Sequence, residues 1–176
     1  MAITIVATVG SASANSFVTL AEMTTYMEGR LNSDAFDDAT TDEQNRSLAE
    51  ATRELSAVTW AGYRTDDTQA LSWPREWVVN VDDPNHDYYD NATIPDRVKR
   101  ATYELALAFL KAGTTDIVSL DESLNVRSES VGQSSVATEY YDPGSRIKGL
   151  ARYPAVTREI RPLLASAGLT TRVVRG

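Results

Sequence analysis

The chain has 176 residues and a mass of 19.3 kDa, the size of one domain or of one domain with an appendage. It has no cysteine and a single histidine, His86, which excludes disulfide bonds, thiolate chemistry and metal sites made of several histidines. Its 42% hydrophobic and 24% charged residues are typical of a globular protein. No apolar run reaches the roughly 18–20 residues that a transmembrane helix needs.

The net charge of −8 is unevenly distributed along the chain. Residues 1–125 carry 9 basic and 21 acidic side chains, whereas residues 126–176 carry 8 basic and 4 acidic ones. From Arg146 to the end there are 7 basic residues and one acidic residue, Glu159. This division indicates an acidic body with a basic C-terminal element that binds an acidic surface on a partner or on another copy of the chain. The alternative is a solvated tail whose charge bias has no function.

The first 18 residues are predicted to form an N-terminal arm and a linker. Residues 3–9 are apolar and rich in β-branched side chains, and a stretch of small residues follows them. An export signal is disfavoured, because no basic residue precedes the apolar run and the run is at the short limit for such a signal. We therefore expect an arm that becomes ordered on assembly, or an added edge strand, in an intracellular protein.

Two capping boxes predict where the first two helices begin. Thr19, with Glu22 three residues later, opens the first helix, and Thr41 with Gln44 opens the second. Between them lies a short acidic segment, which we expect to be a connection. The expected helix ends are Gly29 and about Trp60.

A proline marks the start of each of the two remaining helices. Pro95 opens the third helix, which Gly113 ends. Pro154 opens the fourth, which is expected to reach Ala167 with a kink or break at Pro162. The residues at helical spacing that we expect to be buried are Leu20, Met23, Tyr26, Met27, Leu48, Ala51, Leu55, Val58, Val98, Ala101, Tyr103, Leu105, Leu107, Ala108, Phe109, Ala112, Val156, Ile160, Leu163 and Leu164.

The spacing of apolar residues changes from helical to alternating between the third and fourth helices, which predicts a β-hairpin. Residues 126–140 alternate between apolar or small and charged side chains on either side of Gly132. Residues 168–176 are rich in β-branched residues and are predicted to form a C-terminal arm. The predicted fold class is mainly α: a four-helix bundle-like domain over residues 19–167, with the hairpin between its third and fourth helices and extended N- and C-terminal arms.

The densest polar cluster, residues 82–91, contains residue types found in calcium loops and in acid–base sites. A calcium loop beginning at Asp83 would need glycine at its sixth position and glutamate at its twelfth, and these positions hold Tyr88 and Ile94. His86 has carboxylate neighbours, but no nucleophile motif and no glycine-rich phosphate loop accompany it. We therefore expect a solvated loop, no catalytic activity, no metal and no cofactor.

Aromatic and basic residues that could stack on nucleic-acid bases occur close together in the sequence: Trp60, Tyr63, Arg64, Trp73, Arg75 and Trp77. Acidic residues are interspersed with them, and these would repel phosphate: Asp66, Asp67, Glu76, Asp82 and Asp83. We therefore expect the tryptophans to pack in the core rather than to bind single-stranded DNA (ssDNA).

Six stretches carry a family resemblance over nearly the whole chain: residues 15–22 (NSFVTLAE), 48–55 (LAEATREL), 60–64 (WAGYR), 69–75 (QALSWPR), 94–101 (IPDRVKRA) and 173–176 (VVRG). Together and in this order they resemble a family of small tailed-bacteriophage neck proteins, the head–tail connectors or adaptors that bind beneath the portal. Relatives of this family are often labelled DnaT-like ssDNA-binding proteins. The resemblance implies a mostly helical fold with a hairpin between the third and fourth helices.

The resemblance also implies a structural role without catalysis. The protein would form a homo-oligomeric, dodecameric ring below the portal protein, extend the DNA channel and dock a further neck or tail completion protein. Its location would be the neck of the virion, and the host cytoplasm during assembly. Double-stranded DNA would pass through without specific binding, which the acidic body favours. The alternative is an ssDNA-binding (DnaT-like) module, for which a continuous basic stripe is expected.

The expected interface with the portal or a neighbouring subunit has two parts. A strand at the chain end has unpaired backbone groups that can extend a sheet, while its arginines pair with carboxylates. A disordered tail is the alternative. The hairpin has too little apolar area to be stable alone, so we expect it to pack on another subunit. The predicted residues are Arg172, Val173, Val174 and Arg175 in the arm and Val126, Val131 and Val136 in the hairpin.

Overall fold

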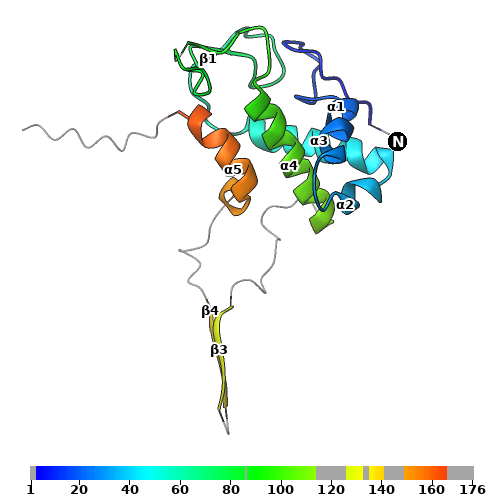
Figure 1. The fold of residues 1–176 in the computed structure, drawn as a ribbon, viewed down its shortest axis with the longest axis vertical. Coiled ribbons are helices and arrows are strands. Elements are labelled where there is room, and N and C mark those ends of the chain that lie inside the picture. Colours follow the sequence, from blue (N-terminus) through cyan, green and yellow to red (C-terminus); the bar gives the residue numbers. More distant parts are fainter. Residues whose placement is uncertain (1–2, 86, 114–125, 133–134, 141–148, 166–176) are drawn as a thin grey trace, which may run out of the picture.

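The computed structural model describes residues 3–85, 87–113, 126–132, 135–140 and 149–165, with the backbone alone for the strands within 126–140. The elements in chain order are α1 (Leu20–Glu28), α2 (Asp34–Asp37), α3 (Thr41–Ser56), β1 (Tyr63–Arg64), β2 (Arg75–Glu76), α4 (Asp96–Ala112), β3 (Val126–Gly132), β4 (Ser135–Tyr140), the 3-10 helix η3 (Gly149–Arg152), α5 (Pro154–Ile160) and the 3-10 helix η4 (Arg161–Leu163). The predicted mainly helical class with one β-hairpin between the third and fourth long helices is confirmed (Figure 1).

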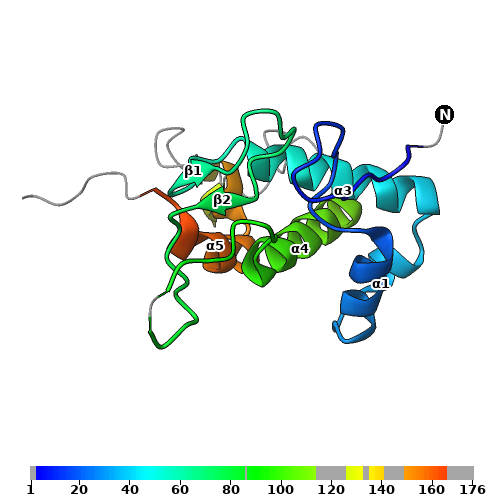
Figure 2. The ribbon, with the colours of Figure 1, turned by 90° about the horizontal axis from the view of Figure 1, so that it is seen from above.

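Helix α4 forms the centre of the helical body. It packs against α3 on one side and against α5 on another, and Figure 2 shows it between these two helices. Its buried residues surround much of its circumference, as the breadth of its apolar stripe predicted: Val98, Ala101, Thr102, Tyr103, Leu105, Ala106, Leu107 and Phe109. Gly113 ends the helix in the left-handed conformation, with φ of 64°. Pro95 is the N-cap of this helix and not part of its first turn.

The capping box of α1 is confirmed, and that of α3 lies one residue earlier than predicted. Thr19 accepts a hydrogen bond from the backbone N–H of Glu22, whose carboxylate accepts one from the backbone N–H of Thr19. For α3 the same reciprocal pair is Thr40 and Glu43. Two overlapping Thr-x-x-Glu/Gln patterns occur here, and in the structure Gln44 instead donates to the carbonyl of Phe36, which connects α3 to α2.

Two helices end earlier than the sequence predicted. Helix α3 stops at Ser56 rather than near Trp60, although the expected residues Leu48, Ala51 and Leu55 are buried. Helix α5 ends at Ile160 and continues as η4 instead of reaching residue 167, because Pro162 has no N–H to continue the helical hydrogen bonding. Leu164 is extended and forms a β-bridge with Trp60.

The N-terminal residues form no strand, contrary to one expectation for residues 3–9. They fold back along the body: Asn15 accepts a hydrogen bond from the backbone N–H of Val6 at 2.8 Å and donates to the carbonyl of Thr4 at 2.8 Å. The backbone of Ile3 contacts both Asp42 and Asn45 of α3. The asparagine side chain thus satisfies backbone groups that a neighbouring strand would otherwise pair.

The hairpin pairs β3 with β4 in antiparallel register. Val131 lies opposite Val136, Val126 lies opposite Tyr140, and the pairing is irregular between Val126 and Ser128. In Figure 1 the hairpin lies apart from the helices. The predicted C-terminal arm, residues 168–176, lies outside the described residues. The short helix α2 and the two-residue strands β1 and β2 were not predicted.

Candidate functional site

The residues predicted as an interface are only partly described by the structure. Arg172, Val173, Val174 and Arg175 lie outside the described residues. Val126, Val131 and Val136 lie in the hairpin, whose register brings Val131 opposite Val136. The side chains of the three valines are not among those described, so this interface stays a prediction.

An exposed aromatic pair, Trp77 and Tyr88, is the most conspicuous surface feature of the described part of the chain. Their side chains are 62% and 55% exposed, and the two rings meet edge to face with centroids 5.3 Å apart. The core packing predicted for the tryptophans holds for Trp60 and Trp73, which are buried and also meet edge to face. It is wrong for Trp77.

The backbone around β2 explains why Trp77 faces solvent. Glu76 pairs with Tyr63 across β1 and β2, and the next residue, Trp77, has φ of +61°. Val78 then enters the core with 1% exposure. A bulky side chain in the left-handed region is rare and costs about 1–3 kcal/mol, so such residues are concentrated at functional positions. No sequence signal separates Trp77 from the apolar residues that follow it.

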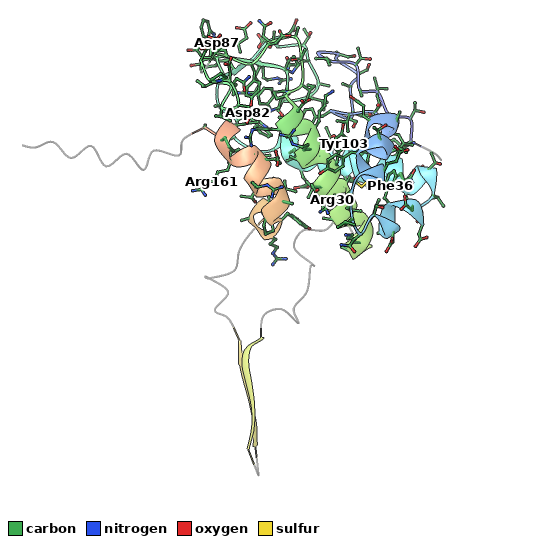
Figure 3. All side chains as sticks on the ribbon, viewed as in Figure 1. Arg30, Phe36, Asp82, Asp87, Tyr103 and Arg161 are labelled. Atoms are coloured by element: carbon green, nitrogen blue, oxygen red, sulfur yellow. The ribbon has the colours of Figure 1, made fainter. Side chains whose placement is uncertain are left out.

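The loop after Trp77 returns the chain so that Tyr88 reaches the indole ring. Val79 and Tyr88 form an antiparallel bridge. The N–H of Asn80 donates to the carbonyl of Asp87 at 2.7 Å, and the N–H of Tyr89 donates to that of Val78 at 2.9 Å. Both rings are therefore held by backbone hydrogen bonds at the base of this loop. Figure 3 shows Asp87 at the outer end of the loop region.

Asp82 connects this loop to helix α4. Arg97 donates to both carboxylate oxygens of Asp82, from Nε at 2.6 Å and from Nη2 at 2.5 Å. The Arg97 guanidinium holds the pKa of the Asp82 carboxyl below its usual value. Tyr89 also donates to Asp82, at 3.4 Å. The loop that carries Tyr88 is thus fixed to the helical body by the Asp82–Arg97 ion pair.

Arg97 also belongs to a group of arginines around one buried carboxylate. Glu159 of α5 is 8% exposed, and its oxygens lie 3.8 Å from Arg97 Nη1, 3.1 Å from Arg100 Nε and 3.4 Å from Arg158 Nε. Arg161 is exposed on η4, and Figure 3 shows its side chain directed away from the helices. We call Arg97, Arg100, Arg158 and Arg161 the α4–α5 arginine cluster. Its cations outnumber the carboxylates that they contact.

Several other cations of the described residues are paired one to one with carboxylates. Arg30 contacts Glu104 at 2.7 Å, Arg46 contacts Asp42 at 2.6 Å and Lys99 contacts Glu22 at 2.8 Å, while Arg53 pairs with Glu50. These pairs leave no excess of positive charge on α1 and α3. Among the described helices, the largest group of cations in excess of carboxylates is therefore the α4–α5 arginine cluster.

The described residues contain neither a metal-binding cluster nor a membrane-spanning helix. No group of three or more histidine, cysteine, aspartate or glutamate side chains there is arranged to hold a metal ion. Within the same residues no helix is both long enough and apolar enough to cross a bilayer.

A family model described as "Putative DnaT-like ssDNA binding protein" matches residues 1–176. Neither the curated proteins nor the solved structures contain a match to this chain.

Proposed function

The chain belongs to the family described as "Putative DnaT-like ssDNA binding protein", and on this premise we propose that it binds single-stranded DNA through Trp77 and Tyr88. Single-stranded DNA binding is the alternative to the head–tail connector, and the family description favours it. The observation that carries the proposal is the exposed aromatic pair, because two large aromatic rings that contact each other in solvent are typical of an interaction site.

Base stacking is the interaction that such a pair provides. Stacking of a base on an aromatic side chain contributes about 1–3 kcal/mol and tolerates any sequence, because every base has a π-face. Their rings meet edge to face, so the contact between them occupies one face of one ring and leaves the other ring faces free. Both rings therefore have a face on which a base can stack.

Electrostatics limit where the DNA backbone can lie. The loop of Tyr88 is acidic, with exposed carboxylates at Asp82, Asp87 and Asp90. The α4–α5 arginine cluster lies on the other side of the Asp82–Arg97 ion pair and is one part of the described surface that favours phosphate. We therefore propose that the backbone runs toward this cluster, with few phosphate contacts and consequently modest affinity.

A fluorescence titration tests the proposal. Trp60 and Trp73 are buried, so quenching of tryptophan emission on addition of an oligothymidine reports on Trp77. Saturable quenching in the intact protein that is absent in Trp77→Phe is expected. Quenching that is equal in both proteins would contradict stacking on Trp77.

A second candidate, the head–tail connector, is favoured by the charge distribution. The cations of α3 and most of those of α4 are already paired, and carboxylates surround the aromatic pair. An exposed aromatic pair with an acidic rim also suits a protein partner with a basic surface. In that role the protein would be a non-catalytic ring subunit bound to the portal protein, and mass measurement of the protein with and without portal tests it.

A further inference from the structure

We propose that a groove between the end of α3 and the β1–β2 loop binds a phosphoryl oxyanion. The groove has a volume of about 300 Å³, and its polar lining includes Arg64, Arg75, Ser56 and Ser72. No aspartate or glutamate is among the described residues that line it. This site would add a contact to the DNA backbone to the proposed function. It rests on the proposed function only in taking the phosphate to be that of DNA.

The two arginines are like charges placed opposite each other. Arg64 and Arg75 are register partners across β1 and β2, an arrangement that is unfavourable unless an anion compensates it. Neither forms an ion pair with a carboxylate of the described residues. Arg64 donates to the backbone carbonyl of Gln69, and the carboxylate of Asp66, two residues further on, already accepts hydrogen bonds from Thr68.

Arg75 is held rigidly with donors to spare. Its guanidinium donates to the carbonyls of Ala61 at 2.7 Å, Gly62 at 2.6 Å and Ser72 at 3.1 Å. These bonds use three of the five N–H groups that an arginine carries. The side chain is thus fixed in place by neutral acceptors, and its charge and remaining N–H groups are available to an anion.

Two serine hydroxyls in the same groove have no partner. The Oγ atoms of Ser56 and Ser72 are both buried and make no hydrogen bond in the described structure. A buried hydroxyl without a partner is unfavourable, so such groups call for a ligand or a water molecule. A hydroxyl can donate to a phosphoryl oxygen, and the guanidinium group is the side chain best suited to bind one.

The end of α3 does not oppose an anion as strongly as a free helix C-terminus would. The partial negative charge there resides on terminal carbonyls. The carbonyl of Leu55 accepts hydrogen bonds from the indole Nε1 of Trp60 at 2.9 Å and from the backbone N–H of Val58 at 3.3 Å, and the carbonyl of Arg53 accepts one from the N–H of Ala57. Two full positive charges therefore outweigh the remaining helix dipole.

The position of the groove suits a DNA backbone contact. Arg75 precedes Trp77 by two residues. Arg75, in β2, lines the groove, and Trp77, directly after β2, carries the ring on which a base would stack. A phosphate in the groove would anchor the strand whose bases reach the aromatic pair. Inorganic phosphate offers the same oxygens without a base.

Titration of the full chain with inorganic phosphate at constant ionic strength, with chloride as the balancing salt, tests the groove. The NMR signals of the Arg64 and Arg75 Nε–H groups and of the Trp60 indole N–H are expected to shift saturably. Arg64→Gln should weaken phosphate binding by about tenfold or more, whereas Arg46→Gln, an arginine far from the groove, should leave it unchanged. Shifts that do not saturate, or that persist unchanged in Arg64→Gln, would overturn the inference.

A second variant separates binding from folding. Ser56→Ala combined with Ser72→Ala removes two unpartnered hydroxyls, so the variant should melt at the same or a higher temperature without phosphate yet bind phosphate at least about threefold more weakly. Unaltered phosphate affinity would exclude the hydroxyls and, with them, this site. Weaker oligothymidine binding by Arg64→Gln identifies DNA as the source of the phosphate, and unchanged oligothymidine binding identifies a free oxyanion. The titration of Trp77 fluorescence with oligothymidine tests the proposed function independently, because Trp77 does not line the groove.

Discussion

The indole ring of Trp77 lies edge-on to the phenol ring of Tyr88, at an interplanar angle of 81°, and both rings remain in solvent. This contact depends on backbone geometry at both ends, because Trp77 has φ of +61° and Tyr88 is held by its bridge to Val79. The exposed position of the rings therefore depends on a strained backbone conformation at Trp77, and this strain can be measured.

Replacing Trp77 by glycine is expected to separate strain from function. Glycine adopts positive φ without a Cβ penalty, whereas alanine retains that penalty. Trp77→Gly should therefore be more stable than Trp77→Ala by about 1 kcal/mol in urea unfolding, while both lose ssDNA affinity. Equal stability of the two variants would show that the left-handed conformation carries no strain.

Gly62 is expected to tolerate no side chain. It has φ of +65°, and a Cβ there would lie 2.0 Å from the carbonyl oxygen of Glu76. Gly62→Ala should reduce the free energy of unfolding by about 3 kcal/mol or more, because the clash is with backbone that cannot move alone. Gly10, with φ of +71° and nothing within 4 Å of a built Cβ, is the matched control, and Gly10→Ala should cost about 1 kcal/mol.

Stability is expected to decline at alkaline pH through Tyr26. Burial, together with its hydrogen bond to Glu104 at 2.7 Å, raises the pKa of Tyr26 to about 12. Between the ordinary tyrosine pKa of 10 and this value, the folded protein keeps a proton that the unfolded chain has released. Raising the pH through this window therefore favours unfolding, and Tyr26→Phe should flatten the decline in thermal midpoint. The same slope in both proteins would rule out Tyr26 as its cause.

Glu159 is expected to be the most sensitive carboxylate of the described structure. Glu159→Gln removes the carboxylate charge that Arg97, Arg100 and Arg158 share, at a side chain that is 10% exposed. The free energy of unfolding should fall by about 2–4 kcal/mol. Glu50→Gln, which breaks a pair with Arg53 on the surface of α3, should cost no more than about 1 kcal/mol. A smaller effect at Glu159 than at Glu50 would contradict this ranking.

Local signals allowed much of the fold to be predicted. The Thr19–Glu22 capping box and the break at Pro162 depend on hydrogen bonds between residues close in sequence, and the structure contains both. The start of α3 was misplaced by one residue because Thr40 and Thr41 begin overlapping capping patterns, and the choice depends on the contact of Gln44 with Phe36.

The candidate site could not be predicted in the same way. The residues 77–79 are all apolar, and the exposure of Trp77 beside the burial of Val78 results from a positive φ that the residue type disfavours. The arginine contacts to Glu159 join positions about 60 residues apart, with separations of 62 for Arg97 and 59 for Arg100. Such proximities arise only when α4 and α5 pack together.

Fluorescence anisotropy of a labelled oligothymidine measures most directly whether the protein binds ssDNA through Trp77 and Tyr88. The intact protein should bind saturably, with affinity that falls as salt rises, and Trp77→Ala with Tyr88→Ala should weaken binding by about tenfold or more. Leu31→Ala, which removes a side chain that is 81% exposed on another part of the surface, should bind like the intact protein. If the intact protein shows no saturable binding even at low salt, the ssDNA proposal is wrong and the connector becomes the better account of the exposed pair.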